Sequence, residues 1–138
     1  KLRYNRLLDI FTGVACYSLQ NHLRTTVIGI GQVEIDEIYV GVDKRGRQFV
    51  FPVEAKGGND EIGVVQIEQN IRLCEEKYPE LICRAIAAQF IDSGKISIFE
   101  FIMQDEEIKK ISERHYSLVP NGEITPKELK QYNQFSVE

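Results

Sequence analysis

The sequence predicts an α/β or α+β domain in which helices flank a central mixed β-sheet. Two β-branched and aromatic runs, residues 33–42 and 47–56, surround a polar turn with glycine, which is typical of a β-hairpin. Helical periodicity precedes and follows this hairpin, and two nearly continuous apolar runs come next. With 138 residues and 43% hydrophobic content, the chain is expected to form a single domain with a substantial core.

The first element predicted is an amphipathic helix over residues 2–24. Its apolar side chains recur close to helical spacing, and polar and basic residues take the other side. The apolar positions are Tyr4, Leu7, Leu8, Phe11, Val14, Ala15, Leu19 and Leu23. Residues 25–31 are rich in Thr, Val, Ile and Gly, so they are expected to form a short strand or a turn into the hairpin.

The hairpin is the element on which the functional interpretation rests. Side chains alternate along a strand, so Phe49, Phe51, Val53 and Ala55 are expected on one face and Val50, Pro52, Glu54 and Lys56 on the other. Pro52 has no backbone N–H, which predicts a sheet edge, a bulge or a break at that position. A distortion there would splay Glu54 and Lys56 outward.

After Gly57 and Gly58, a second helix is predicted from an N-cap at Asn59 to about Tyr78, where Pro79 stops it. Its expected apolar stripe is Val64, Ile67, Ile71, Cys74 and Tyr78. The apolar runs 81–91 and 96–103 are expected as strands covered on both faces, with a turn between them. Helices are predicted near 105–115 and 126–133, the last with a capping box at residues 125–128.

Charge and cysteine content narrow the classes of protein. The net charge of −4 argues against a sequence-independent nucleic-acid coat protein, but an acidic metal site is compatible with it. The three cysteines lack metal-site spacing and are expected to be reduced. Without a signal peptide or an apolar run long enough to span a bilayer, the chain is expected to be cytoplasmic. Because the sequence begins with Lys1 and not with Met, a flanking domain outside this sequence is one of the expectations that stay open.

Asp36, Glu54 and Lys56 are the candidate catalytic residues. Pairing of the two hairpin strands would bring the carboxylates of Asp36 and Glu54 together near the ammonium of Lys56. Carboxylate oxygens are suited to Mg²⁺ or Mn²⁺, and such ions activate water and polarise phosphoryl oxygens. A lysine would orient the nucleophile or stabilise negative charge on phosphorus. The alternative is that Glu54 and Lys56 form an ordinary surface charge pair.

This arrangement resembles the PD-(D/E)XK nuclease superfamily, in which an Asp on one strand and a D/E-x-K triplet on the next bind metal and position water. The resemblance covers about residues 2–103 and implies a restriction-endonuclease-like core. It implies that Asp36 and Glu54 bind Mg²⁺ (or Mn²⁺) and that Lys56 assists the attacking water. Ile35 stands where the motif has proline, so Asp36, Glu34 and Glu37 all stay open as the first ligand. Strand alternation favours Asp36 with Glu34 as its helper.

The helix after the triplet carries a further candidate. Similar nucleases often have a polar residue there that touches the site, which makes Gln66 an expected catalytic auxiliary; exposed glutamine is the alternative interpretation. The basic hairpin tip, Lys44, Arg45 and Arg47, would grip phosphates or simply keep the turn soluble.

The function expected is that of a metal-dependent endonuclease of the restriction type that acts on DNA. A homodimer is expected, because it would place two sites on a duplex. Three alternatives stay open. The first is a non-catalytic nucleic-acid-binding module of the same fold, the second a nuclease acting on RNA or branched DNA. The third is a structural protein in which Lys56 only neutralises Glu54.

Overall fold

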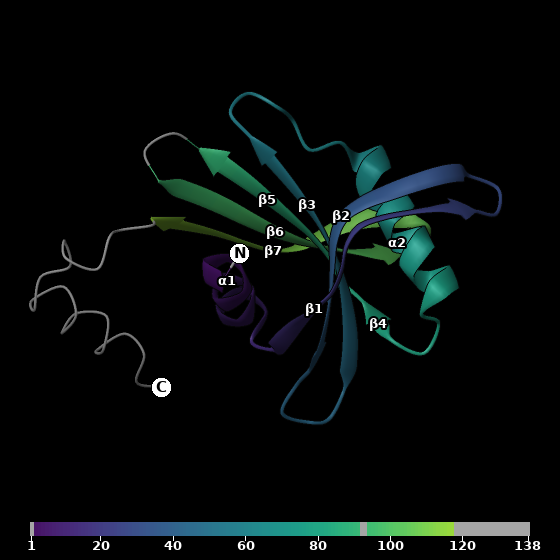
Figure 1. The fold of residues 1–138 in the computed structure, drawn as a ribbon, viewed down its shortest axis with the longest axis horizontal. Helices are drawn as coiled ribbons and strands as arrows, with labels where there is room; N and C mark the ends of the chain where they lie inside the picture. Colours follow the sequence, from purple (N-terminus) through teal and green to yellow (C-terminus); the bar gives the residue numbers. More distant parts are fainter. Residues whose placement is uncertain (1, 92–93, 118–138) are drawn as a thin grey trace, which may run out of the picture.

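The computed structural model describes residues 2–91 and 94–117, which form one mixed sheet of seven strands with two helices packed against it (Figure 1). In chain order the elements are α1 (Leu2–Thr12), β1 (Ala15–Val27), β2 (Gly31–Val42), β3 (Gln48–Gly57), α2 (Val64–Lys77), β4 (Ile82–Cys83), β5 (Ala85–Ile91), β6 (Lys95–Gln104) and β7 (Glu107–Ser117). The mixed α/β architecture predicted from the sequence is therefore confirmed.

The strand order across the sheet is β1-β2-β3-β5-β6-β7, with the short β4 also beside β3. All neighbours are antiparallel except β3, which runs parallel to β4 and β5. Parallel neighbours need a crossover connection, and α2 provides it between β3 and β5. The predicted hairpin is thus confirmed as β2 and β3, and the two later apolar runs as β4–β5 and β6.

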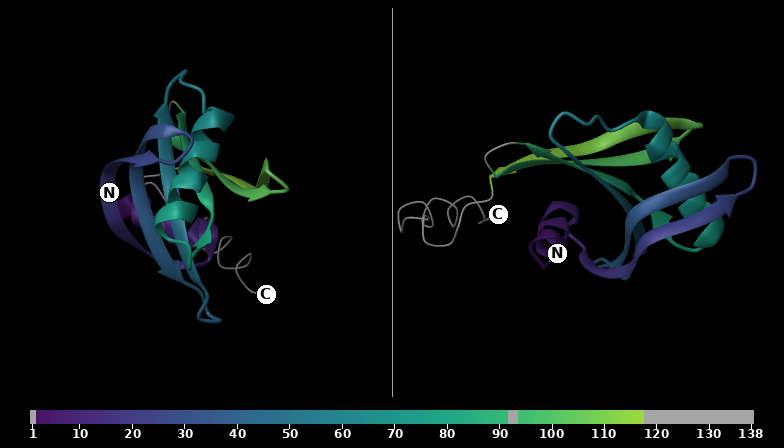
Figure 2. Two further views of the ribbon diagram at one scale, coloured as in Figure 1. Left: turned by 90° about the vertical axis from the view of Figure 1, so that its right-hand side faces the viewer. Right: turned by 45° about the horizontal axis from the view of Figure 1, so that its top comes forward.

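The two faces of the sheet carry separate cores. On one face Leu8 of α1 packs with Phe49, Phe51 and Val53 of β3. On the other face Val50 of β3 packs against α2. Further along α2, buried side chains meet the alanines of β5. Figure 2 shows α2 lying between the β1–β2 hairpin and the β5–β6–β7 strands. Alternation along β3 places its even-numbered side chains on one face, as the sequence predicted, and the structure shows that this face meets α2.

Strands β2 and β3 separate halfway along their length. Their pairing ends at Glu37 opposite Val53; beyond it β2 continues with β1 alone, and β3 continues beside β5 (Figure 1). The alternation of β2 also breaks here, because Ile35 and Ile38 both pack on the α2 side although they are three residues apart. The two strands thus form a fork that opens directly before Glu54.

Pro52 explains an interruption on the other side of β3. It pairs with Ile38 of β2, yet the parallel ladder stops after Val50 opposite Cys83 and resumes at Val53 opposite Ile86. Proline lacks the N–H that the ladder requires, so β4 and β5 are separate strands. Of the three features predicted at Pro52, the structure has the break.

The long N-terminal helix predicted over residues 2–24 is wrong beyond Thr12. Gly13 adopts a φ of +69°, a conformation that ends helices, and the Thr12 hydroxyl donates a hydrogen bond back to the Leu8 carbonyl at 2.7 Å. The chain then forms β1, which extends through the segment predicted as a short strand or turn up to Val27. Most of β1 is solvent-exposed, so its few apolar residues give a pattern that also fits a helix.

The helix predicted near 105–115 is also wrong, because this segment is β7, paired antiparallel with β6. Asp105 and Glu106 connect the strands, with φ angles of 53° and 64°. Positive φ at both central residues is the requirement of a two-residue hairpin turn, which usually contains Asn or Gly. The sequence lacks that signal, and the charged residues of β7 favour a helix by composition.

The second helix begins later than predicted. Gly63, not Asn59, precedes its first turn, and Val64 is 66% exposed instead of part of the buried stripe. Residues 58–63 form a loop held by Gln89, whose side-chain amide donates to the Gly58 and Asp60 carbonyls at 3.4 and 3.0 Å. The predicted end near Tyr78 is confirmed, since α2 stops at Lys77.

Some predictions fall outside the residues that the structure describes: the helix at 126–133, its capping box, and part of the turn before β6. None of the helices in the described ranges is long and apolar enough to cross a lipid bilayer. Cys16, Cys74 and Cys83 are free thiols, as expected.

Candidate metal and catalytic site

Asp36, Glu54 and Lys56 meet where β2 and β3 separate. Across the opening of the fork, the Asp36 carboxylate accepts a hydrogen bond from the Ala55 backbone N–H at 3.2 Å. This bond places the Asp36 side chain beside the strand segment that carries Glu54 and Lys56. Lys56 lies two residues after Glu54 on the same face of β3, so the Asp36, Glu54 and Lys56 side chains lie close together at the fork. The convergence of these three residues predicted from the sequence is present in the structure.

Glu54 is 4% exposed and is held by a polar chain from α2. Asn70, which is fully buried, donates from Nδ2 to Glu54 Oε1 at 3.0 Å. The side-chain oxygen of Asn70, Oδ1, in turn accepts a hydrogen bond from Gln66 Nε2 at 3.0 Å. Gln66 Nε2 also lies 3.3 Å from the backbone carbonyl of Glu34, to which it donates. This series of hydrogen bonds therefore links α2 to both strands of the fork and fixes the Glu54 carboxylate.

Burial raises the pKa of Glu54 to about 7. The Asn70 hydrogen bond and the Lys56 charge oppose this rise, whereas the charge of Asp36 and a hydrogen bond shared with it add to it. Two carboxylates held together in a partly dry site resist ionising together, and a bound cation would remove that penalty. Perturbation of this kind, at a residue with specific charged neighbours, is characteristic of functional sites.

The other predicted auxiliaries lie in different surroundings. The Glu34 carboxylate pairs with Arg24 of β1 at 2.9 Å, so it would have to release this partner to join Asp36. Glu37 accepts a hydrogen bond from the Tyr39 hydroxyl, and Tyr39 belongs to the core on the α1 face. Gln66 reaches the site through Asn70 and is not in direct contact with Glu54 in any described hydrogen bond.

Asn70 is a residue of the candidate site that the sequence reasoning missed. Its signal was present, because Asn70 lies three residues after Ile67 and directly before Ile71, within the buried face of α2. A polar residue in such an apolar stripe needs a hydrogen-bonding partner inside the protein. Here that partner is Glu54. The presence of Asn70 within the apolar stripe of α2 could therefore have indicated a buried polar partner in the sheet.

The carboxylates of Asp36 and Glu54 could hold an ion such as Mg²⁺, which keeps several water ligands, better than an ion that needs side chains at every coordination position. Within residues 2–91 and 94–117, no three Asp, Glu, His or Cys side chains gather into a group that would hold a metal. Asp36 and Glu54 form a pair, and Mg²⁺ is commonly held by one or two carboxylates together with waters and substrate phosphates. A cation held between Asp36 and Glu54 would favour the ionised form of Glu54, whose pKa burial raises.

The basic hairpin tip lies at the opposite end of β3 from these residues. From Arg47 to Glu54 a strand spans roughly 23 Å, too far for one phosphate to touch both. Arg47 is paired with Asp43 at 2.6 Å, and its guanidinium lies 5.5 Å from the centre of the Phe49 ring. Any contact of the tip with a nucleic acid would therefore be made at a distance from the carboxylates.

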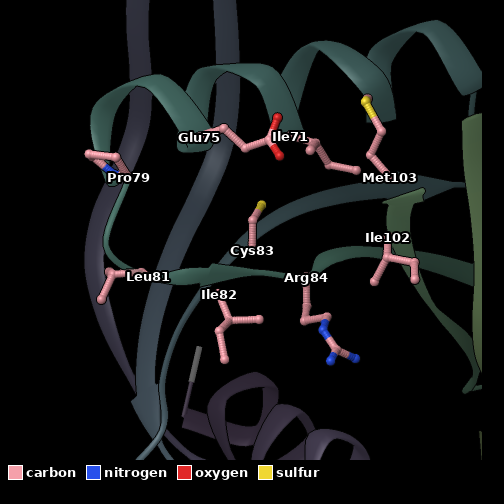
Figure 3. A pocket seen from close by; sticks show the side chains of 9 residues that line it. All are labelled: Ile71, Glu75, Pro79, Leu81, Ile82, Cys83, Arg84, Ile102 and Met103. Carbon is pink, nitrogen blue, oxygen red and sulfur yellow. The ribbon is translucent and has the colours of Figure 1, made fainter. Parts of the chain in front are cut away.

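A separate cavity of about 420 Å³ lies between α2 and β4 and offers no comparable chemistry (Figure 3). Most of the residues that line it are apolar, and the two charged side chains, Glu75 and Arg84, point in different directions (Figure 3). Cys83 points toward α2, where a hydrogen bond with Cys74 and burial raise the pKa of the Cys83 thiol. A thiol in this state is a poor nucleophile and a poor metal ligand.

Comparison of the chain with protein-family models, with curated proteins and with solved structures gave no match.

Proposed function

We propose that this protein is a Mg²⁺-dependent nuclease that hydrolyses phosphodiester bonds in DNA. The observation that carries the proposal is the meeting of Asp36, Glu54 and Lys56 at the fork between β2 and β3, with Glu54 buried and held by Asn70. Two carboxylates can hold a metal ion, and a nearby lysine can stabilise the charge that develops on the phosphoryl oxygens during phosphodiester hydrolysis.

The order of elements supports a restriction-endonuclease-like core. A helix, three antiparallel strands, a crossover helix and a strand parallel to the third follow one another in α1, β1, β2, β3, α2 and β5. This order agrees with the resemblance to the PD-(D/E)XK superfamily, and the triplet lies at the carboxyl end of β3, where parallel strands commonly carry their sites.

Asp36 and Glu54 would hold the Mg²⁺ ion, with Glu34 as a further candidate. Once bound, the ion would neutralise charge on the scissile phosphate and lower the pKa of a water. Asn70 fixes the orientation of the Glu54 carboxylate, and Gln66 fixes that of Asn70. Lys56, half-buried and two residues along the same face from Glu54, would place its ammonium against the attacking water or a phosphoryl oxygen.

DNA is the proposed substrate, and hydrolysis of both strands of a duplex would be achieved by a homodimer with two such sites. RNA or branched DNA would present the same phosphodiester to the same residues, because the chemistry at Asp36, Glu54 and Lys56 does not involve the sugar or the base. A non-catalytic module of this fold is the second candidate function, and it predicts nucleic-acid binding that Glu54→Ala leaves intact.

Calorimetric titration with Mg²⁺ and with Mn²⁺ tests the metal site. We expect one binding event in the wild-type protein, lost in Glu54→Ala and kept in Glu37→Gln. The second variant is a matched control, because Glu37 lies on β2 beside Asp36 but bonds to Tyr39 instead of the site. A wild-type protein that binds neither ion, or a Glu54→Ala variant that binds as well as the wild type, would contradict the proposal.

A further inference from the structure

A second pocket adjoins the candidate site on the same face of the sheet. Lys56 of β3 is paired with Gln89 of β5, and Gln89 with Ser97 of β6. Residues paired across neighbouring strands project from the same face, and neighbouring strands lie about 4.8 Å apart. Gln89 and Ser97 line a pocket of about 680 Å³, here named the side pocket, whose other wall is the loop at residues 58–62. The side pocket thus begins one strand away from Lys56.

The side pocket has an aromatic wall and a few polar groups. Phe99 and Phe101 of β6 line it, with ring centres 6.4 Å apart, and Ile62 of the loop and Val64 of α2 also line it. Ser97, which is 3% exposed, carries a hydroxyl hydrogen-bonded to His115. A mostly apolar concavity of this size with a small number of polar groups is the usual form of a site for a small planar molecule.

The charges around the side pocket exclude a phosphate and favour a neutral ligand. Asp60 and Glu61 belong to its wall and would repel an anion. Its one lysine among the lining residues, Lys110, is already paired with Glu113 and lies 5.8 Å from the centre of the Phe99 ring. The part of a nucleotide that fits such surroundings is the base, which stacks on aromatic side chains and carries no charge.

The loop wall is held in place before any ligand arrives. Gln89 donates to the carbonyls of Gly58 and Asp60 at 3.4 and 3.0 Å, which ties the loop to the strand beside Lys56. The side pocket and the candidate catalytic residues are therefore fixed relative to each other by one strand pair and one side chain. A ligand that spans the two would need a phosphate and a base within a single nucleotide.

We propose that the side pocket binds the base of an unpaired nucleotide next to the phosphodiester held at Asp36, Glu54 and Lys56. This inference rests on the proposed nuclease function and adds a substrate class to it. A base inside a duplex is stacked and paired and cannot enter a pocket, so the substrate is single-stranded nucleic acid or a duplex with an extruded nucleotide.

The test compares binding of two labelled octamers by fluorescence anisotropy, with Ca²⁺ in place of Mg²⁺. One is an octathymidylate; the other is an abasic octamer with the same phosphates. We expect the wild type to bind the octathymidylate at least about 10-fold more tightly than the abasic octamer, because base stacking on aromatic side chains is lost without bases. Phe99→Leu should remove most of this difference.

Two variants keep the test independent of folding defects. Phe90→Leu is the matched control, since Phe90 pairs with Ile96 on the α1 face of the sheet and should leave the preference unchanged. Val64→Trp adds bulk at an exposed position of the side pocket without disturbing the core, and should also remove the preference. Equal binding of the two octamers by the wild type, or the same preference in Val64→Trp as in Phe90→Leu, would overturn the side-pocket proposal.

Cleavage measured in parallel separates the two proposals. Metal-dependent cleavage by the wild type without any preference for bases would overturn the side pocket alone. Tight, base-dependent binding without metal-dependent cleavage of any substrate would support the side pocket and contradict the nuclease function.

Discussion

Asn70 Nδ2 lies 3.0 Å from Glu54 Oε1, between α2 and the sheet, and both side chains are almost fully buried. This hydrogen bond favours the charged form of a carboxylate whose burial favours the neutral form. The Asn70 hydrogen bond therefore increases the fraction of Glu54 that is ionised near neutral pH. An ionised Glu54 accepts a cation more readily.

Replacing Asn70 should weaken metal binding in a pH-dependent way. Asn70→Leu removes a hydrogen bond to a charged group, typically about 1.5–3 kcal/mol, so the pKa of Glu54 should rise further. We expect Mg²⁺ affinity at pH 7 to fall by about 10-fold or more, and by less at pH 9, where a larger fraction of Glu54 is ionised in both proteins. Calorimetry at both pH values checks this, with Gln69→Leu on the same helix as control. Equal affinities for Asn70→Leu and wild type would contradict it.

Glu54 should make the metal-free protein less stable as the pH rises. Its pKa is about 7 in the folded protein against an ordinary 4.5. Its contribution to stability is thus fully present below pH 4.5 and is lost as the pH rises through 7. Glu54→Gln should be about 1–3 kcal/mol more stable than the wild type at pH 8.5, with the difference shrinking toward pH 4.5.

Urea unfolding in the presence of a chelator measures that difference. Glu68→Gln is the control, because Glu68 lies exposed on α2 in a pair with Arg72 and should show no such trend. A Glu54→Gln variant that is less stable than the wild type at pH 8.5 would show that Lys56 and Asn70 outweigh the burial of the charge.

Lys56 should contribute to catalysis more than to metal binding. In Lys56→Met, the two carboxylates remain, so Mg²⁺ affinity should stay within a few-fold of the wild type. The rate of cleavage should fall by roughly 10²–10³-fold, as is usual when a group acting on the developing charge is removed. Lys95→Met, at the exposed start of β6, is the control. A large loss of metal affinity with an unchanged single-turnover rate would assign Lys56 to another role.

Asp36 and Glu34 should respond differently to neutralisation. Asp36→Asn removes a carboxylate that faces Glu54, so we expect Mg²⁺ affinity to fall by about 10-fold or more and the pKa of Glu54 to fall. Glu34→Gln breaks an exposed pair with Arg24, worth at most about 1 kcal/mol of stability. Its effect on Mg²⁺ affinity should be smaller. An equal loss in both variants would assign Glu34 as a third ligand.

The hairpin and its triplet could be predicted because their signals are local. Strand alternation alone placed Glu54 and Lys56 on one face, and the glycine-containing turn joined β2 to β3. The break in the alternation of β2 between Ile35 and Ile38 was not visible in the sequence. It depends on tertiary packing, because β2 leaves β3 to cover α2.

The two outer strands, β1 and β7, were mispredicted because neither shows the regular alternation of apolar and polar residues that indicates a strand. Only a few residues of β1 are buried, among them Cys16 and Leu23, and most residues of β7 are polar. Their strand conformation is imposed by pairing with β2 and β6, and the side chains of β1 and β7 alone do not show this pairing. Gly13 was the one local sign that α1 ends early.

The most direct measurement is cleavage of DNA by the wild type and Glu54→Ala. Supercoiled plasmid, linear duplex and single-stranded DNA would each be incubated with Mg²⁺, with Mn²⁺ and with chelator, and single-stranded RNA would be included. We predict metal-dependent cutting of at least one DNA substrate, abolished by chelator and by Glu54→Ala, and unchanged in Glu37→Gln. Cutting that survives in Glu54→Ala, or a wild type that cuts none of these substrates, would contradict the assignment of Asp36, Glu54 and Lys56 as a nuclease site.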